Sequence, residues 1–444
     1  MLVRKPHETP RKPRLATIIW WVSPLLVLLV FSSVGIAALQ NRSAVEEFQD
    51  LTSGMRQARK SGDWKAFHAS ALRMLQFLNG SPDARLDVAR SDVNTGDTAG
   101  ALLQLRIYAA MGQANEIVKT LPDFGAIRAN ADFAKTVRRM NSNAQPVSHA
   151  AQALTIPDAG LVPEDIDYDA RAKRFFLTSI LEKRIVTLDA GGHLADFAKA
   201  PDNWPMLALK IDVRQRIVWA TEVALDGFSS APKAEWGRSA LLGYGLDDGK
   251  LLRRIEGPQH SNLGDMALAA SGDLLISDGT GGGVYLKRNG SAKLERIDKG
   301  DFISPQTPAF VSGGSRAFVP DYVRGIGLLE LASGRVRWIP MENKYALEGV
   351  DGMYFHDGRL IAVQNGTTPE RVMEFQLDAN LARVTSEQPI ESATPTLDPT
   401  HGVIVGDEFY YIANSGWNEL DDSGSVAKCA TLTPARIMRA RLPS

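Results

Sequence analysis

Cysteine is almost absent from this sequence: among 444 residues there is one, Cys429. One cysteine excludes an intrachain disulfide, a Cys-x-x-Cys redox pair and a zinc site built from several thiolates. The Gly-x-Ser-x-Gly turn of serine hydrolases and the His-Glu-x-x-His helix of zinc proteases are also missing. The stability of the chain therefore has to come from a packed core, and two common classes of hydrolase have no support in the sequence.

Net charge is nearly absent as well, because 50 lysines and arginines stand against 51 aspartates and glutamates, for a formal charge of −1. A nucleic-acid partner is therefore not expected, since proteins that bind nucleic acid carry a basic surface. The hydrophobic share of 44% and the charged share of 23% are those of an ordinary globular protein. A chain of 444 residues is too long for one ordinary domain, so we expect more than one folded part.

Charge of either sign is missing from the 27 residues between Arg14 and Arg42. About 20 apolar residues cross the hydrocarbon layer of a membrane as a helix, which satisfies its own backbone hydrogen bonds. The stretch predicts a transmembrane helix at residues 17–39. Five basic residues and only one acidic residue precede it, so the tail of residues 1–16 is expected to stay in the cytoplasm.

A cleaved signal peptide is the alternative interpretation of this stretch, because small residues around Ala37 and Ala38 suit cleavage. The apolar core of a signal peptide usually has about 7 to 15 residues, so we favour an uncleaved anchor. Under either interpretation residues 43–444 are exported. We therefore expect a single-pass membrane protein whose bulk lies in the periplasm or outside the cell.

Apolar residues recur every three or four positions from residue 43 to about residue 143, which indicates helices. The pair Gly62-Asp63 recurs as Gly96-Asp97, 34 residues later. This spacing resembles that of tetratricopeptide helical hairpins, in which Gly-Asp forms the tight turn. Two interpretations stay open: the segment binds a protein partner on a concave face, or it is a spacer between the membrane and the rest of the chain.

From about residue 151 the pattern changes to short β-rich runs separated by turns that contain glycine. One unit recurs six times, each time beginning with an inner strand, and the six starts are Pro163, Pro205, Leu263, Gln306, Gly349 and Pro399. Repeats of about 40 to 50 residues with four short strands each are typical of a β-propeller. The predicted fold is therefore a transmembrane helix, a short tetratricopeptide-like helical segment and a six-bladed propeller over residues 151–444.

The repeat also predicts details of the propeller. The longest interval between starts carries an insertion at residues 225–238. The segment near Ala153 is expected to pair with the segment near Arg441, because closing the ring within one blade removes two exposed sheet edges. Polar residues end the second strand of four units, and their side chains are expected to bind the backbone of the following turn; they are Asp278, Asp321, Asn365 and Asn414.

Three strings at the starts of inner strands contain carboxylates: PEDIDYD from Pro163, GDMALAASGDLLISDG from Gly264 and VDGMYFHDGRLIAVQNG from Val350. These strings resemble the regucalcin and gluconolactonase superfamily of six-bladed propellers, with paraoxonase as a more distant relative. The resemblance covers residues 151–444. It implies a divalent cation in the central channel, calcium being the expected ion, that polarises the carbonyl of a small lactone or sugar-derived ligand and its attacking water.

By motif, the resemblance assigns the metal to Glu164, Asp265 and Asp351. Asp351 is also the expected general base, and His401, at the start of the sixth inner strand, is a second catalytic candidate. A structural role in hydrogen bonding within a blade is the alternative for Asp165 and Asp265. The same alternative applies to His401, because a lone histidine near a strand start is more often structural than catalytic.

One expected ligand is missing, because Gly264 stands where the family has asparagine, and the nearby Asn262 is a candidate replacement. Two functions therefore stay open. The first is a membrane-anchored, extracytoplasmic, metal-dependent hydrolase of a lactone or ester. The second is a non-catalytic scaffold that binds a ligand or a protein at the membrane surface.

Overall fold

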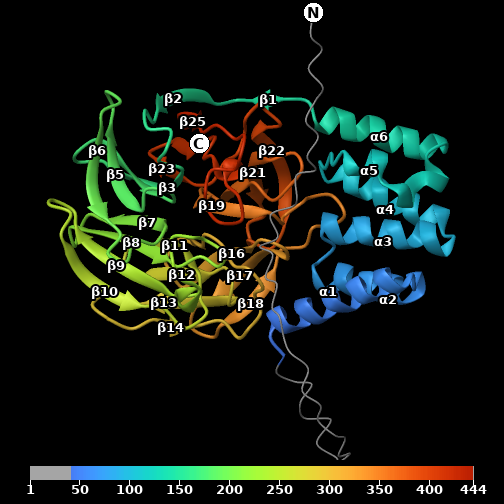
Figure 1. Cartoon of the computed structure of the whole chain (residues 1–444), viewed down its shortest axis with the longest axis horizontal. Coiled ribbons are helices and arrows are strands. Elements are labelled where there is room, and N and C mark those ends of the chain that lie inside the picture. Colours follow the sequence, from blue (N-terminus) through green and yellow to red (C-terminus); the bar gives the residue numbers. More distant parts are fainter. Residues whose placement is uncertain (1–41, 444) are drawn as a thin grey trace, which may run out of the picture. The chain divides into compact units, whose positions relative to one another are not determined.

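The computed structural model describes residues 42–443, in which helices come first and strands follow (Figure 1). The predicted cytoplasmic tail and transmembrane helix, residues 1–16 and 17–39, lie outside these residues. Within residues 42–443, no helix has both the length and the apolar composition that crossing a bilayer requires. The membrane anchor therefore stays a prediction.

Short capping motifs at Gly-Asp pairs join the helices of the first part. Gly62 and Gly96 end their helices in the left-handed conformation, with φ of +71° and +91°, and Asp63 and Asp97 cap the helices that follow. The two Gly-Asp turns predicted from the sequence are confirmed. The helices are α1 (Ala44–Ser61), α2 (Trp64–Phe77), α3 (Pro82–Thr95), α4 (Thr98–Ala110), α5 (Ile117–Thr120) and α6 (Ala131–Asn143), with a 3-10 helix at Pro122–Ile127 before α6.

Two apolar clusters hold the helices together. One surrounds Phe67 and Ala71 and also contains Ile303 from the strand-forming part of the chain. The other surrounds Ala89 and Ala101, whose lack of exposed surface shows how closely the paired helices approach. The helices therefore pack against the rest of the described chain as well as against one another. Their assignment as tetratricopeptide repeats stays a prediction.

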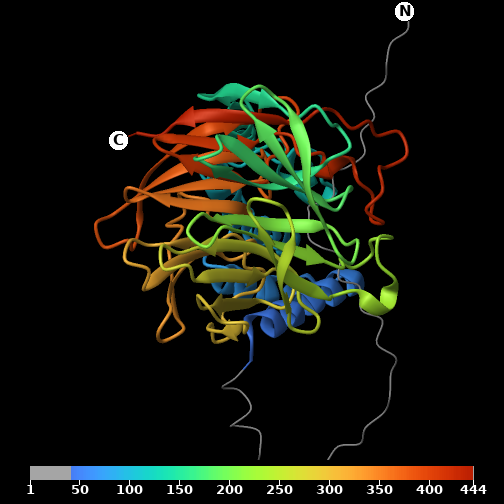
Figure 2. The same cartoon turned by 90° about the vertical axis from the view of Figure 1, so that its left-hand side faces the viewer.

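Six antiparallel sheets of four or five strands follow in residues 147–441, and they are the blades of a six-bladed propeller (Figures 1 and 2). The predicted propeller is confirmed. The inner-to-outer strands of blades 1 to 3 are β3 (Pro163–Asp169), β4 (Arg174–Ser179), β5 (Arg184–Asp189) and β6 (Leu194–Lys199); β7 (Met206–Asp212), β8 (Ile217–Val223), β9 (Ser239–Gly245) and β10 (Leu251–Glu256); and β11 (Leu263–Leu268), β12 (Leu274–Asp278), β13 (Gly283–Lys287) and β14 (Glu295–Arg296).

The remaining three blades follow the same order. They are β15 (Ala309–Phe310), β16 (Arg316–Asp321), β17 (Gly325–Glu330) and β18 (Arg335–Trp338); β19 (Val350–His356), β20 (Arg359–Gln364), β21 (Arg371–Leu377) and β22 (Val384–Ser392), to which β1 (Val147–Ser148) is added; and β23 (Gly402–Val405), β24 (Glu408–Ile412), β25 (Arg436–Arg441) and β2 (Ala151–Thr155).

Blade 6 closes the ring, because its outer strand comes from the beginning of the propeller and its other three strands come from the end. Strand β2 runs antiparallel to β25, with Ala151 opposite Arg439 and Thr155 opposite Arg436. The pairing predicted between these two segments is confirmed. Neighbouring blades are joined by buried apolar side chains; Phe176 of blade 1, for example, shares a cluster with Met206 of blade 2. Burying side chains of this kind contributes roughly 1.5–3 kcal/mol each.

One face of the propeller carries the starts of the inner strands. Each inner strand is antiparallel to the second, so the connections from second to third strands lie at this face too. The connection between β8 and β9, residues 224–238, is the predicted insertion, and that between β24 and β25 is also long. The helical segment contacts the same face, where Arg324 Nε donates a hydrogen bond of 3.1 Å to the backbone oxygen of Phe77.

Candidate functional site

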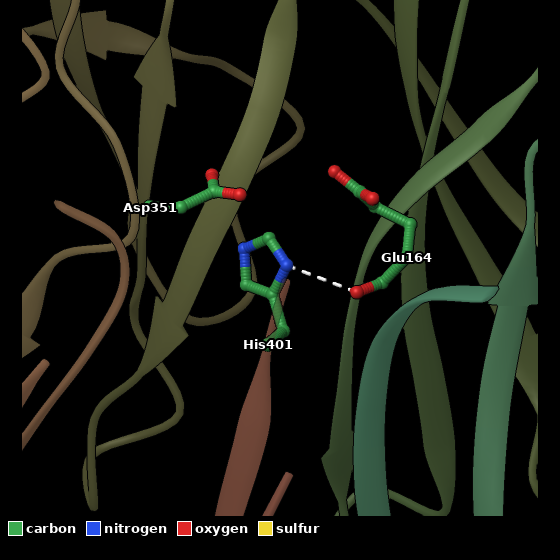
Figure 3. Close-up of side chains that lie close together, drawn as sticks. All are labelled: Glu164, Asp351 and His401. Atoms are coloured by element: carbon green, nitrogen blue, oxygen red, sulfur yellow. Dashed lines mark hydrogen bonds between the residues drawn. The ribbon is translucent and has the colours of Figure 1, made fainter. Parts of the chain in front are cut away.

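Glu164, Asp351 and His401 come together where the inner strands of three blades begin (Figure 3). Glu164 belongs to β3, Asp351 belongs to β19, and His401 immediately precedes β23. One possible ligand atom from each residue lies within 4.8 Å of the other two. Both carboxyl side chains are half-buried and His401 is buried. The fold therefore brings together two of the three predicted metal ligands and both predicted catalytic residues.

Bulges at the strand starts explain why these side chains point to one place. The pairing of β3 with β4 shifts between Pro163 and Ile166, and that of β19 with β20 shifts between Val350 and Met353. A bulge re-aims the side chains beside it. Strands β7 and β11 are irregular at the same point. Four blades therefore have equivalent residues here, which are Glu164, Leu207, Gly264 and Asp351.

Glu164 is held by an aromatic side chain from a distant loop, because Trp417 Nε1 donates a hydrogen bond to Glu164 Oε2. Burial and the charge of Asp351 raise the pKa of Glu164 from 4.5 to about 8, against weaker opposing effects of His401 and Trp417. Two carboxyl groups this close do not both ionise at neutral pH unless a cation compensates them. Glu164 therefore keeps a proton near pH 7 when no further cation is bound.

An amide side chain donates a hydrogen bond to the carboxylate of Asp351. Asn365 Nδ2 donates a hydrogen bond of 2.6 Å to Asp351 Oδ2, and Tyr322 Oη donates one of 2.9 Å to Asn365 Oδ1. The expectation that Asn365 binds the backbone of its own turn is therefore wrong, because its amide binds Asp351 on β19, the inner strand of the same blade. For Asp278 and Asp321 the same expectation is confirmed, since both accept hydrogen bonds from backbone N–H groups of the following turn.

His401 is hydrogen bonded at both ring nitrogens. Nδ1 lies 2.9 Å from the backbone oxygen of Glu164 (Figure 3), and Nε2 lies 2.7 Å from Asp265 Oδ1 and 2.9 Å from Thr307 Oγ1. Carbonyl and carboxylate oxygens only accept hydrogen bonds, so both nitrogens carry protons. Burial alone would lower the pKa of His401, but the charge of Asp351 and the hydrogen bond to Asp265 raise it well above 6.5. His401 is thus an imidazolium with no free lone pair for a metal.

Asp265 does not belong to the group of three, but it hydrogen bonds to the histidine of that group. Its Oδ1 accepts hydrogen bonds from His401 Nε2 and, at 2.6 Å, from Thr307 Oγ1. Asp165 is equally occupied, because its Oδ2 accepts hydrogen bonds of 2.7 Å from the backbone N–H of Leu209 and from Lys210 Nζ. Both aspartates therefore have structural partners, but these partners lie in other blades, whereas the sequence left open a role within one blade.

The other equivalent positions add no charged ligand. Leu207 is apolar, and Gly264 has no side chain, although a Cβ atom there would make only ordinary contacts, at 3.6 Å from Asn262 Oδ1 and 4.0 Å from Leu207 Cδ1. Asn262 Oδ1 is itself buried and has no hydrogen-bond partner among the described residues. Carboxylate oxygens suit a hard cation such as Ca²⁺, and Glu164 and Asp351 bring two carboxyl groups together here. These residues therefore fit the implied metal.

Sequence reasoning did not assign Trp417, Asn365 and Thr307 to the site. Trp417 and Asn365 lie 253 and 14 residues from the carboxylates that they bind, and Thr307 lies 94 residues from His401. The only sequence signals were the placement of Thr307 at an inner-strand start and of Asn365 at the end of a second strand. Neither signal shows which partner the side chain reaches.

Two surface hollows of the described chain lie away from this group. The larger, about 710 Å³, is lined by residues of β16, β17 and β18 and by Asn380 and Ala382. The smaller, about 310 Å³, lies between blade 6 and blade 1 and includes Tyr168 and Tyr410. Neither is lined by the carboxylates described above, so the chemistry of the side chains, not the size of a hollow, identifies the candidate site.

No protein-family model matches the chain, and no curated protein matches it. Among solved structures, similar chains include a protein described as an oxidoreductase (glucose dehydrogenase) from Thermus thermophilus, with 13% identity, a TM-score of 0.45 and coverage of 66% of this chain and 99% of that one. A luciferin-regenerating enzyme has the same identity, TM-score and coverage of this chain, and 95% of its own length is covered.

Virginiamycin B lyase from Staphylococcus aureus is similar at 14% identity and a TM-score of 0.43, over 66% of this chain and 99% of the lyase. Similarities of this size carry no argument about activity. The assignment of the fold therefore rests on the strand pairing described above.

Proposed function

We propose that this chain is a membrane-anchored, extracytoplasmic propeller that binds a divalent cation and hydrolyses a small lactone or related ester. The convergence of Glu164 and Asp351 beside His401, with one ligand atom of each within 4.8 Å of the others, is the observation that supports the proposal most. Glu164 and Asp351 are the proposed ligands, Asn262 supplies a third oxygen, and Ca²⁺ is the expected ion.

The raised pKa of Glu164 supports the same conclusion, because burial and a neighbouring carboxylate make an added positive charge favourable at this point. When bound, the cation would polarise an acyl carbonyl and make a nearby water more acidic. Asn365 and Trp417 orient the two carboxyl groups, and Asp351 is placed to accept the proton of the water. Hydrolysis adds water across the acyl C–O bond, which gives a carboxylic acid and an alcohol.

Asp265 and His401 have a supporting role in this proposal. As a buried imidazolium, His401 balances part of the negative charge without competing for the cation as a ligand. The uncharged stretch before Arg42 supports the location, with the propeller in the periplasm or outside the cell. The helical segment supplies a further surface for a protein partner there.

Cation binding by the full-length chain tests the proposal. Addition of Ca²⁺ is expected to raise the midpoint of thermal unfolding, since a ligand that binds only the folded state stabilises it. Tb³⁺, a luminescent substitute for Ca²⁺, is expected to be sensitised by Trp417, whose indole contacts Glu164. Glu164→Gln and Asp351→Asn are each expected to abolish both signals.

Asp226→Asn is the matched control, because Asp226 is an exposed residue of the 224–238 connection. Its binding of Ca²⁺ and Tb³⁺ is expected to equal that of the wild type. If Ca²⁺, Mg²⁺, Mn²⁺ and Zn²⁺ all leave the thermal midpoint unchanged, the metal-dependent function fails. If a cation binds, release of acid from glucono-δ-lactone and from unsubstituted lactones, followed at constant pH, decides whether the site is catalytic.

A non-catalytic scaffold is the second candidate, and the equivalent positions of blades 2 and 3 favour it. Leu207 and Gly264 offer no side-chain donor, and both nitrogens of His401 are occupied. A site with so few ligands suits the binding of a ligand or a structural ion better than it suits turnover. Cation binding without hydrolysis of any lactone would favour this function.

A further inference from the structure

The two chain segments that hold Asp351 in place are the segments that the helical part of the protein contacts. The first runs from Ala346 to Asp351 and leads into β19. The second, residues 364–369, joins β20 to β21 and carries Asn365, whose amide binds Asp351 Oδ2 at 2.6 Å. Helices α3 and α4 lie beside this blade (Figure 1). The candidate site is therefore connected to the helices through these two segments.

The first segment is contacted by the start of α3. Glu348 is buried and lies three residues before Asp351. Its Oε1 accepts a hydrogen bond of 3.2 Å from the backbone N–H of Asp83, and its carboxyl group also hydrogen bonds with the Ser81 side chain, which caps α3. The capped start of α3 thus contacts the segment that leads into β19, the strand of Asp351.

The second segment is contacted by the chain that follows α4. The backbone N–H of Ala114 donates a hydrogen bond of 2.6 Å to the backbone oxygen of Thr368, and Thr368 N–H donates one of 3.3 Å to Gln113 Oε1. Gln113 is buried, with 3% of its surface exposed. These bonds hold the turn that carries Asn365.

Apolar packing joins the same parts. Met111, at the end of α4, is fully buried in one cluster with Val350 and Met353, the residues on either side of the bulge at Asp351. The two segments also touch each other, since Gly366 N–H donates a hydrogen bond of 3.1 Å to the backbone oxygen of Gly349. A Cβ atom on Gly349 would lie 2.6 Å from the backbone carbon of Gly366, so the crossing leaves no room for a side chain at this position.

We propose that the helical segment is a positioning element of the axial site, which holds Asp351 and Asn365 in place through Ser81, Met111 and Gln113. The inference rests on the proposed cation site and adds a partner to it within the chain. It gives the helices a role besides those of spacer and partner-binding surface. Because coupling between two sites is reciprocal, a protein bound to these helices and a cation bound at Asp351 would affect each other.

The double variant Ser81→Ala/Gln113→Ala in the full-length chain tests the inference, because it changes only residues outside the propeller. The dissociation constant for Tb³⁺, followed by sensitised luminescence, is expected to rise roughly tenfold. Hydrogen exchange of the backbone at residues 349–356 is expected to become faster without added cation, whereas residues 163–169 around Glu164 keep the rate of the wild type. Ser81→Thr, which keeps the hydroxyl and the cap, is expected to restore wild-type behaviour at that position.

Asp63→Ala and Gln145→Ala, combined in one chain, are the matched control. Asp63 caps α2 as Ser81 caps α3, and the side chain of Gln145 hydrogen bonds only to the backbone of Asn141 among the described residues. This control loses a helix cap and a glutamine without touching blade 5. Its affinity for Tb³⁺ and its exchange at residues 349–356 are expected to match the wild type.

The two measurements separate the inference from the proposed function. If the wild type does not bind Tb³⁺, the cation site fails, but faster exchange at residues 349–356 in the double variant still upholds positioning of this strand by the helices. If exchange there is unchanged, or if the control variant shows the same changes as the double variant, the inference is overturned. An unchanged affinity for Tb³⁺ in a wild type that binds the ion also overturns it.

Discussion

Carboxyl groups at two adjacent positions of the inner strands have opposite surroundings. Asp165 and Asp265 are buried, and their oxygens accept hydrogen bonds from groups of the propeller itself, including Lys210 and His401. Glu164, one position before Asp165, is half-buried and faces Asp351. Residues of one chemical type therefore bind groups of other blades at one position and face a second carboxyl group at the next.

The difference follows from the bulge at the start of each inner strand. In a regular strand neighbouring side chains point to opposite faces, and the bulge changes which direction each one takes. The buried aspartates then meet donors of the next blade or across the ring. Glu164 and Asp351, at the position before, face one another.

The largest effect that would test this comparison is expected for Asp265→Ala. The substitution leaves the imidazolium of His401 and the hydroxyl of Thr307 buried without their acceptor. Removing one partner of a buried ion pair costs about 3–5 kcal/mol of unfolding free energy. Urea unfolding measures it, and Asp226→Ala, at an exposed position, is expected to stay within about 0.5 kcal/mol of the wild type. A loss below about 1 kcal/mol would show that Asp265 is not the partner described here.

Gly264→Asn sharpens the comparison by adding a side chain where blade 3 has none. The position has room, because a Cβ atom would have no neighbour closer than 3.6 Å. An added amide oxygen beside Glu164 and Asp351 is expected to lower the dissociation constant for Ca²⁺ about tenfold, a change of about 1.4 kcal/mol. Isothermal titration measures the affinity. Gly264→Ala is the control, and an equal gain in that variant would contradict a ligand role for the new amide.

Glu348 is a third kind of buried carboxyl group, because it lies at the contact between the helices and the propeller. Burial and the nearby carboxylate of Asp83 raise its pKa well above 4.5, against weaker opposing effects of Ser81 and Arg371. The folded state therefore holds the proton more tightly than the unfolded state. The resulting stabilisation is complete below about pH 4.5 and is lost as the pH rises through the raised pKa of the folded state.

Glu348→Gln removes this dependence, because the amide does not titrate. From pH 5 to pH 8 the unfolding free energy of the wild type is expected to fall relative to that of the variant by about 1 kcal/mol or more. Chemical denaturation at several pH values measures the difference. A difference that stays constant over this range would contradict the raised pKa.

The smallest effect is expected for Glu164→Gln on stability in the absence of a cation. Glu164 keeps a proton near pH 7 because its pKa is raised to about 8, so an uncharged amide of similar shape replaces it at little cost. The unfolding free energy at pH 7 is expected to change by less than about 1 kcal/mol. A loss as large as that of Asp265→Ala would place Glu164 among the structural carboxylates instead.

Much of the fold follows from local patterns in the sequence. Glycine turns and short β-rich runs at regular spacing predict six blades, and the Gly-Asp pairs at Gly62 and Gly96 predict the helix ends that the structure shows. The closing pair of strands, near Ala153 and Arg441, could also be predicted, because an open ring would leave two sheet edges unpaired.

The candidate site was predictable only in part. Glu164 and Asp351 begin equivalent strands, and the symmetry of the repeat is enough to bring such residues together. The hydrogen bonds of Asn365 and Trp417 break that symmetry, because each depends on the path of one particular connection. For Asn365 the local expectation of a turn contact was wrong, since the carboxylate of Asp351, on the inner strand of the same blade, is a stronger acceptor than a backbone group.

By itself the sequence determined the repeat, the number of blades, the helical segment and the positions at which acidic residues begin inner strands, because each is encoded in patterns a few residues to a few tens of residues long. Only the tertiary structure decided which carboxyl groups are paired, that Asp351 and Asp265 keep His401 charged, and that α3 and α4 contact the segments around Asp351. These outcomes depend on distances between side chains that are far apart in the chain, and packing alone sets those distances.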